Sequence, residues 1–282
     1  MPFNHKYNKR KPFRKTAKEE EKLPSGPKSL NKMDKPMTSS LEELGKEIRL
    51  NKYVAHCGIC SRRKAGEYIF EGLVKVNGAV KKEPGYRISP MDEVRFRDKV
   101  IRPESRKIYV LLNKPKNAVT TAKDEKGRRT VFDLIGSDVP ERIFSVGRLD
   151  MATTGLLLLT NDGDLSKKLT HPKYKVKKIY HVILDKPVTK NDLELIAKGL
   201  ELEDGIALVD GVSHVKDKDK NEVGIELHIG KNRIVRRIFE HLGYEVVKLD
   251  RMYFGGLTKK DLPRSRYRFL SEQEVIMLKH FT

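Results

Sequence analysis

An aspartate stands directly before the most apolar run of the chain. Asp150 lies in the sequence GRLDMATTGLLLLTNDGDL, residues 147–165, which contains four consecutive leucines at residues 156–159. A carboxylate at the edge of a buried strand is partly desolvated, and it stays ionised only beside a cation or hydrogen-bond donors. Such a group can act as a nucleophile, although an aspartate at this kind of position is more often a turn or capping residue. Arg148, two residues earlier, is equally well explained as its surface partner.

Other titratable residues offer weaker alternatives. Asp162 and Asp164 precede an expected helix, where capping explains them, and Asp250 follows the strand-like residues 245–249 without a neighbouring motif. The histidines show no paired metal spacing. His181 lies on an alternating strand, so we expect it to face away from Tyr180 and to do no chemistry.

The chain has two cysteines, Cys57 and Cys60, which form a CxxC. A zinc site would need four Cys or His ligands, and the second pair is missing. A redox pair is expected within a βαβ pattern, which the surrounding sequence lacks. We therefore predict two small, reduced core side chains.

Residues 48 to about 96 predict a compact module. Helical spacing of Leu50, Tyr53 and Val54 indicates one helix, and Ser61 can cap a second helix with Arg62, Arg63 and Lys64 in its first turn. Val74, Val76 and the pair Asn77-Gly78 then predict a hairpin. Basic residues in a first turn oppose the helix dipole, and a bound phosphate would offset that cost.

The rest of the chain predicts a larger domain after a link over residues 97–107. Strand signals occur at residues 109–112, 155–160, 178–184 and 224–229, a further short element at 130–135, and helical periodicity at 234–242. Strands exceed helices and do not alternate regularly with them, so the fold class is α+β, with a mixed, largely antiparallel sheet and flanking helices. We divide the chain into residues 1–47, 48–107 and 108–282.

Two resemblances sharpen this reading. LNKYVAHCGICSRRKAGEYIFEGLVKVNG, at residues 50–78, resembles the alpha-L motif, a small RNA-binding module named for a ribosomal small-subunit protein. The chain also resembles the RsuA-type pseudouridine synthases, which have three motifs in a fixed order. The matching segments are GRLD with TTGLLLLTNDG, then KKIYHV at residues 177–182, then GKNRIVRRIFEHLG at residues 230–243. The likeness extends across nearly all of the chain from residue 48 when three further segments are included: Asn113-Lys114-Pro115, GRRTVFDL at residues 127–134, and His171-Pro172.

The resemblance implies roles for three residues. Asp150 matches the family's nucleophile, Tyr180 its active-site tyrosine, and Arg236 the arginine that pairs with the aspartate. Asp150 would attack the target nucleotide, with Tyr180 stacked on the flipped base and Val235 packed under the uracil. Taken alone, Tyr180 is more often a core tyrosine on an alternating strand, and a core role in a helix explains Val235 equally well. The implied activity is isomerisation of a uridine in ribosomal RNA, and the members that act on the large subunit look most similar.

Extruding a base from folded RNA requires contacts to the backbone. The candidates for RNA binding are basic or amide residues within or beside the motifs and the module: Arg62, Arg63, Lys64, Lys75, Arg148, Lys178, Lys231, Asn232, Arg233 and Arg237. Each could equally be a solvated surface charge. We expect no metal and no cofactor. The alternatives are a non-catalytic RNA-binding factor on the same fold, or the same enzyme acting on small-subunit or transfer RNA.

Composition agrees with a polyanionic partner. The 282 residues include 59 Lys and Arg against 39 Asp and Glu, a formal charge of +20. Residues 1–47 are rich in Lys, Pro and Ser with little to bury, which predicts a disordered basic arm. No apolar run reaches the roughly twenty residues of a membrane span. We expect a cytoplasmic monomer that binds ribosomal RNA and no membrane.

Overall fold

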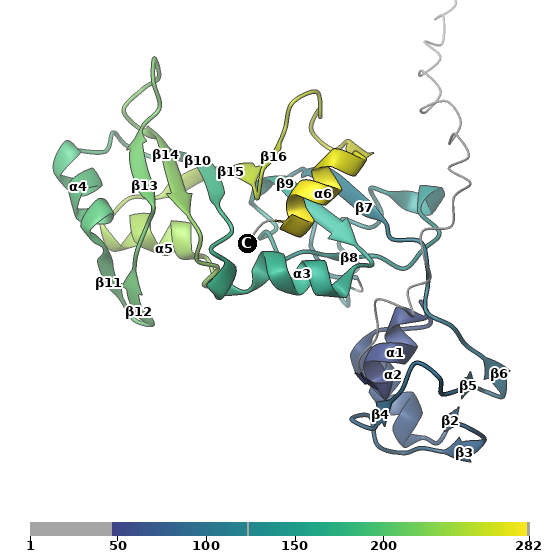
Figure 1. Ribbon diagram of the computed structural model, residues 1–282. Helices are drawn as coiled ribbons and strands as arrows, with labels where there is room; N and C mark the ends of the chain where they lie inside the picture. The colour runs from purple at the N-terminus through teal and green to yellow at the C-terminus, as the bar shows by residue number, and fades with distance from the viewer. Residues whose placement is uncertain (1–46, 123, 281–282) are drawn as a thin grey trace, which may run out of the picture. The chain divides into compact units, whose positions relative to one another are not determined.

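The computed structural model describes residues 47–122 and 124–280 (Figure 1). The predicted basic arm lies, apart from residue 47, outside the described residues. Within them, no helix has both the length and the apolar character needed to cross a membrane.

The module after residue 47 has two helices followed by short strands. The helices are α1 (Leu50–His56) and α2 (Arg62–Phe70), and the Ser61 hydroxyl caps α2 by accepting from the Lys64 backbone N at 3.2 Å. One pair joins β1 (Ile48–Arg49) to β4 (Arg87–Ile88), and a four-stranded sheet has the order β3-β2-β5-β6. Its strands are β2 (Val74–Val76), β3 (Ala79–Val80), β5 (Val94–Phe96) and β6 (Lys99–Val100). The predicted cap is confirmed.

The predicted hairpin is also present, between β2 and β3. Asn77 and Gly78 connect the strands with φ angles of 50° and 80°. Two successive positive φ angles are what a two-residue hairpin turn requires, and Asn-Gly adopts them readily. The hairpin therefore follows directly from its local sequence.

The two cysteines belong to the core of this module. Cys60 is buried, Cys57 is half-buried, and both are free thiols packed with residues such as Leu50 and Ile69. Burial raises the pKa of Cys57 to about 12, so its thiol is protonated at neutral pH. The described residues hold no cluster of three or more His, Cys, Asp or Glu side chains fit for a metal ion. These observations agree with the predicted reduced core side chains.

The larger domain is built on one sheet. In the described part of the chain it has nine strands, with the order β13-β14-β10-β15-β9-β7-β17, while β16 pairs with β15 and β8 with β9. Only β9 and β15 run parallel; the other neighbours are antiparallel, which confirms the predicted mixed, largely antiparallel sheet. The strands are β7 (Tyr109–Lys114), β8 (Phe144–Ser145), β9 (Thr154–Thr160), β10 (Lys178–Leu184), β13 (Gly211–His214), β14 (Glu222–Leu227), β15 (Val246–Phe254), β16 (Leu257–Thr258) and β17 (Tyr267–Phe269). A separate hairpin pairs β11 (Leu200–Leu202) with β12 (Gly205–Ala207).

Helices cover the sheet in two groups (Figure 1). The helical segments are η1 (Gly136–Asp138), α3 (Gly163–Thr170), η2 (Pro172–Tyr174), α4 (Lys190–Lys198), α5 (Ile234–His241) and α6 (Glu272–His280). β9 is buried on both faces, with Leu156 and Leu158 in one hydrophobic cluster with α3 and α6 residues, and Leu157 and Leu159 in another with α4 and α5 residues. Asp162 caps α3, as predicted, by accepting from the Leu165 backbone N at 3.0 Å.

The central strand β15 carries two bulges against β10. Tyr180 pairs with Arg251 while Ile179 pairs with Tyr253, so Met252 is an extra residue, and a second register shift falls between Ile183 and Leu184. A bulge bends a strand and changes the face that its later residues occupy. The strand also runs to Phe254, whereas the sequence predicted strand character only as far as residue 249.

One expected element is different. Residues 130–135 form turns with a single bridge between Val119 and Thr130. The Asp133 carboxylate accepts from the Thr130 backbone N at 2.7 Å, and the Thr130 hydroxyl accepts from the Asp133 backbone N at 3.2 Å. Side chains that bond to the nearby backbone in this way compete with strand pairing, which explains the turn.

Candidate active site

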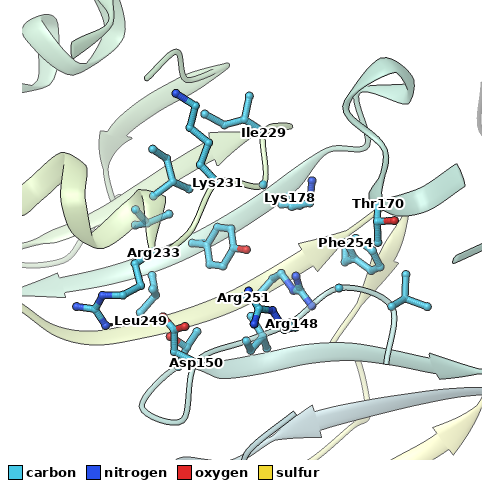
Figure 2. A pocket seen from close by; sticks show the side chains of 18 of the residues that line it. Arg148, Asp150, Thr170, Lys178, Ile229, Lys231, Arg233, Leu249, Arg251 and Phe254 are labelled. Carbon is cyan, nitrogen blue, oxygen red and sulfur yellow. Dashed lines mark ion pairs between the residues drawn. The ribbon is translucent and has the colours of Figure 1, made fainter. Parts of the chain in front are cut away.

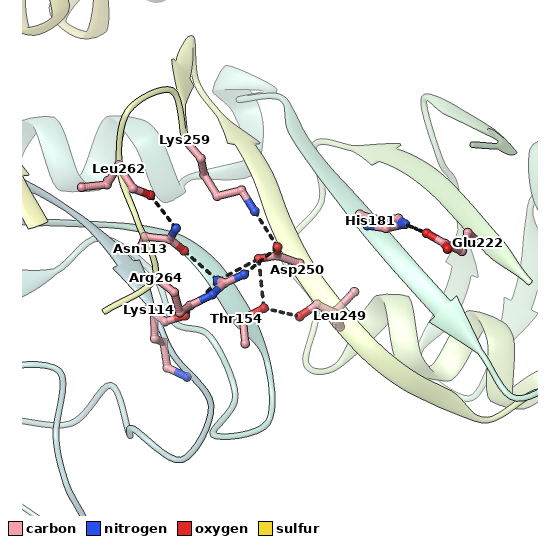
Figure 3. Close-up of polar contacts among 10 residues, drawn as sticks. All are labelled: Asn113, Lys114, Thr154, His181, Glu222, Leu249, Asp250, Lys259, Leu262 and Arg264. Atoms are coloured by element: carbon pink, nitrogen blue, oxygen red, sulfur yellow. Dashed lines mark hydrogen bonds and ion pairs between the residues drawn. The ribbon is translucent and has the colours of Figure 1, made fainter. Parts of the chain in front are cut away.

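A pocket opens where the two hydrophobic clusters of the larger domain meet. Leu149, Tyr180 and Val235 belong to one cluster, and Leu169 and Phe254 to the other, and all five line the pocket. Its polar lining comes from the loop before β9, from the end of α3, from β10 and β15, and from the segment that leads into α5 (Figure 2). These polar or charged lining residues are Arg148, Asp150, Thr153, Thr170, Lys178, Tyr180, Lys231, Arg233 and Arg251.

Asp150 lies in the pocket on a loop whose backbone is closely held. Gly147 begins the turn with a φ of 73°, and the Asp150 carbonyl accepts from the Thr153 backbone N at 3.0 Å. The Asn117 backbone N donates to the Met151 carbonyl at 2.9 Å. The Asp150 side chain itself is 40% exposed. The carboxylate is therefore accessible to a ligand while its backbone is fixed.

A buried lysine supports this loop from beneath. The Lys114 side chain is fully buried, and its ammonium donates to the carbonyl oxygens of Asp150 at 3.0 Å, Met151 at 3.3 Å and Thr153 at 2.8 Å. A fourth contact goes to the Pro115 carbonyl at 3.1 Å. Burial lowers the pKa of Lys114 to about 8, while the nearby Asp150 charge opposes that shift. The carbonyl oxygens stabilise the ammonium in the absence of a direct ion pair.

Tyr180 stands on the pocket face of β10 and is 9% exposed. It lies directly across the strand pair from Arg251. His181, the next residue, lies on the opposite face of the sheet, as predicted: it lines a second pocket, and its Nε2 is 2.7 Å from the Glu222 carboxylate. That contact has the distance of an ion pair but not the geometry of a hydrogen bond.

The arginine closest to Asp150 is Arg233, whose Nη1 lies 3.9 Å from Asp150 Oδ2. The ion pair expected between Arg236 and Asp150 is not made in this structure. Arg236 is 8% exposed, and its Nη1 donates to the Val246 carbonyl at 2.8 Å. Burial lowers the pKa of Arg236, the neighbouring Arg233 lowers it further, and the Asp150 charge acts in the opposite direction. The charge of the Asp150 carboxylate therefore acts on Arg236 although the two side chains form no ion pair.

The predicted RNA-binding residues divide into three groups. Arg148, Lys178, Lys231 and Arg233 line the pocket. Asn232 and Arg237 do not, and Arg237 is engaged by Asp204 in two hydrogen bonds of 2.8 and 3.0 Å. The module carries the others: Arg62 and Arg63 are exposed, Lys64 pairs with Glu67 at 2.7 Å, and Lys75 pairs with Asp98 at 2.6 Å.

Two charged residues that shape the site were not predicted. Lys114 was named only within the motif Asn113-Lys114-Pro115, without a role of its own, and Arg251 was not singled out at all. A signal for Arg251 exists in the sequence, because Leu249 and Arg251 are two residues apart and a strand places such residues on one face. Extending the strand past residue 249 would have placed an arginine on its buried face.

Comparison with known proteins decides the family. Residues 108–241 match the RNA pseudouridylate synthase family, and residues 48–94 match the S4 domain. A Bacillus subtilis protein named ribosomal large subunit pseudouridine synthase B is 41% identical over 235 residues, 82% of this chain and 95% of that protein. The chain belongs to the RNA pseudouridine synthase family. It is an isomerase of the RsuA type, as the sequence motifs predicted.

Further relatives agree with this assignment. An Aquifex aeolicus protein described as an uncharacterized RNA pseudouridine synthase is 39% identical over 82% of this chain and 94% of its own length. A crystal structure of a pseudouridylate synthase matches with a TM-score of 0.60 and 31% identity, over 82% of this chain and 99% of that one. The similarity thus spans the S4 domain as well as the synthase domain.

Proposed function

We propose that this pseudouridine synthase isomerises a uridine of large-subunit ribosomal RNA, with Asp150 as the nucleophile. The observation that carries the proposal is the placement of the Asp150 carboxylate. It lies accessible in the pocket, on a loop fixed by Lys114, and Tyr180 lines the same pocket. Among the described residues that line this pocket, Asp150 is the one carboxylate.

The reaction follows from that placement. An Asp150 oxygen attacks C1′ of the ribose, and the glycosidic bond breaks with its electron pair on N1 of the uracil. The detached uracil turns in the pocket, and its C5 attacks C1′ and displaces the carboxylate. C5 then loses its proton and N1 gains one, so atoms and charge balance without a co-reactant.

The pocket walls suit a flipped uridine. Tyr180 offers a flat ring for stacking and a phenol that can exchange a proton with the ribose, while Val235 and Leu249 add apolar surface beside the base. Stacking on an aromatic ring offsets part of the cost of extrusion. Uracil can rotate against such a surface because apolar contacts are not directional.

Two arginines contribute to the charge around the nucleophile. Arg233, at 3.9 Å, supplies a half-exposed guanidinium, and the buried Arg236 acts through its electric field. A cation near a carboxylate favours the ionised form, which is the nucleophilic one. Arg236 therefore keeps a role in catalysis under this proposal, as a positioning residue that does not contact the nucleophile.

The choice of RNA rests on three observations. The S4 match covers residues 48–94, the Bacillus subtilis relative is named for the large ribosomal subunit, and the chain carries a net charge of +20. A strong positive charge favours a phosphate-rich partner. The direct test is to map pseudouridines in ribosomal RNA from cells with and without the gene. Loss of one large-subunit pseudouridine is expected, whereas loss from small-subunit or transfer RNA alone would reassign the substrate.

The role of Asp150 is tested with Asp150→Asn. The amide keeps the size of the carboxylate but is a much poorer nucleophile, so pseudouridine formation should be abolished while RNA binding is retained. Asp217→Asn is the matched control, because Asp217 lies exposed in a turn with a φ of 57° that asparagine also tolerates. Substantial turnover by a homogeneous Asp150→Asn protein would remove Asp150 from this role.

A further inference from the structure

A buried arginine in the pocket has fewer partners than its charge requires. Arg251 is 3% exposed. Its Nε donates to the Leu156 carbonyl at 2.7 Å, while its Nη2 is buried without a hydrogen-bond partner. No carboxylate within the described residues forms an ion pair with it at 4.0 Å or less. A buried cation in this condition is costly unless something else binds it.

The bulge at Met252 places Phe254 beside this arginine in the pocket wall. On a regular strand Arg251 and Phe254, three residues apart, would occupy opposite faces. The extra residue puts Leu249, Arg251 and Phe254 in the wall of the same pocket. There the Arg251 guanidinium lies 4.7 Å from the centre of the Phe254 ring, which fixes its plane. Bulges of this kind commonly re-aim a side chain beside an active site.

Two further cations, Lys178 and Arg148, line the same pocket. The Lys178 ammonium donates to the carbonyls of Val176 at 3.1 Å and His228 at 2.7 Å, which leaves its third hydrogen available. Arg148 is exposed and forms no hydrogen bond or ion pair with the described residues. In the view of Figure 2, Arg148, Arg251 and Lys178 are all drawn apart from Arg233. Asp150 pairs with Arg233, and no carboxylate among the described residues forms an ion pair with any of these three cations.

We propose that Arg251, Lys178 and Arg148 form a phosphate subsite that binds a backbone phosphodiester flanking the flipped uridine. The inference rests on the proposed function, because it assumes that the nucleotide beside Asp150 belongs to RNA. A guanidinium presents two parallel N–H groups that match two phosphate oxygens, and a phosphodiester supplies the missing negative charge. The uracil carbonyl oxygens are neutral, so they would satisfy the open hydrogens but not the charge.

The subsite gives the RNA backbone a fixed point next to the reacting sugar. Arg251 is held by Leu156, Phe254 and the strand itself, so little side-chain entropy is lost when it binds a phosphate. Tyr180 on β10 lies directly opposite Arg251 on the neighbouring strand β15. The stacked base and the bound phosphate are therefore both positioned by the same pair of strands. Arg251 is thereby a positioning residue that orients the ribose toward Asp150.

The test compares binding of small probes to the full chain. Uridine 5′-monophosphate, uridine 3′-monophosphate and uridine are titrated by NMR or calorimetry into the parent protein, Arg251→Met and the control Lys248→Met. Lys248 lies exposed on the same strand and lines the second pocket, on the other face of the sheet. The parent and the control should bind one of the monophosphates about tenfold more tightly than uridine, the size expected for a charge-assisted contact. In Arg251→Met this preference should fall to about threefold or less, with the affinity for uridine kept.

A merely structural role for Arg251 would lower all affinities together and leave their ratio unchanged, so retention of the preference in Arg251→Met overturns the proposal. A parent protein with no preference for either monophosphate also overturns it. If Arg251→Met does not fold, the less buried Lys178→Gln carries the same test, with the ratio falling by about threefold or more. Failure of the proposed function would appear separately, as a parent protein that forms no pseudouridine in any ribosomal RNA.

Discussion

The Lys114 ammonium lies 3.0 Å from the backbone carbonyl oxygen of Asp150. It also reaches the carbonyls of Met151 and Thr153, and thus holds three of the four residues that separate Leu149 from the strand β9. Removing the ammonium would take the side-chain donor from the carbonyls of Pro115 and Thr153, whereas those of Asp150 and Met151 would keep the backbone donors Thr153 N and Asn117 N. The backbone that carries Asp150, the proposed nucleophile, is therefore tied to the strand β7, on which Lys114 stands.

We predict that Lys114→Met lowers the free energy of unfolding by about 2–4 kcal/mol, because unsatisfied buried carbonyls are costly while the loss of a buried charge offsets part of that cost. Lys116→Met, an exposed neighbour, should change it by no more than about 0.5 kcal/mol. Urea denaturation of both variants measures the difference. Equal midpoints for Lys114→Met and the parent would mean that water or a rearranged loop replaces the ammonium.

Substitution should distinguish the roles of the two arginines near Asp150. Arg233→Met should leave stability almost unchanged and lower turnover by about fivefold, the effect expected for a half-exposed ion pair. Arg236→Met removes the donor to the Val246 carbonyl, so it should destabilise by about 1–3 kcal/mol as well as slow the reaction. Single-turnover rates and unfolding curves of both proteins provide the comparison. A stable but inactive Arg236→Met beside a fully active Arg233→Met would instead indicate that Arg236 moves to contact Asp150 when RNA binds.

Several elements of the fold and the site could be predicted from the sequence. The sequence pattern of β10 predicted its bounds, and the Asn77-Gly78 turn and the Ser61 cap were predicted correctly, because in each case local preferences decide the structure. Asp150 and Tyr180, which the motifs singled out as site residues, line the same pocket. The prediction of a mixed, largely antiparallel sheet also agrees with the structure.

What could not be predicted depends on long-range geometry. The side-chain direction of Arg236 is set by the carbonyl of Val246, ten residues away, and the placement of Phe254 beside Arg251 by a bulge at Met252. Alternation along a strand assumes one residue per partner, so a bulge defeats it. Lys114 sits in a strand whose pattern appears apolar, and its four acceptors belong to residues beyond that strand.

Binding of RNA should weaken as pH rises through about 8. Burial, and then the neighbouring Arg251, lowers the pKa of Lys178 to about 8, while Asp210 opposes the shift. Only the protonated amine attracts a phosphate, so affinity is full below this pKa and falls above it. Bound phosphate favours the protonated form and will move the midpoint upward.

The test is the Kd for ribosomal RNA between pH 7 and 9.5. Because arginine remains charged throughout this range, Lys178→Arg should show a flatter profile than the parent. Burial also lowers the pKa of Lys114 to about 8, so the difference between the two proteins is decisive, and not the parent profile by itself. Identical profiles would assign the pH dependence to a group other than Lys178.

The last prediction concerns the S4 domain, whose helix α2 begins with three basic residues and has no acidic residue in its first turn. Arg62 and Arg63 are exposed there, and Lys64 is partly committed to Glu67. Positive side chains at a helix N-terminus oppose its dipole, and a bound phosphate removes that conflict. Since the domain carries none of the synthase motifs, these residues should position RNA and not affect the chemical step.

Replacing all three with alanine should weaken RNA binding and lower the slope of log Kd against log salt by about two units, one for each of the two arginines that form no ion pair with the described residues. Turnover at saturating RNA should stay within about tenfold. The matched control replaces Lys216, Lys218 and Lys220, exposed residues between β13 and β14, which removes the same net charge. An equal fall in slope for the control would mean that only total charge matters. An unchanged slope for the α2 variant would place the RNA contacts elsewhere, and the basic residues around Lys231 would then be the next to test.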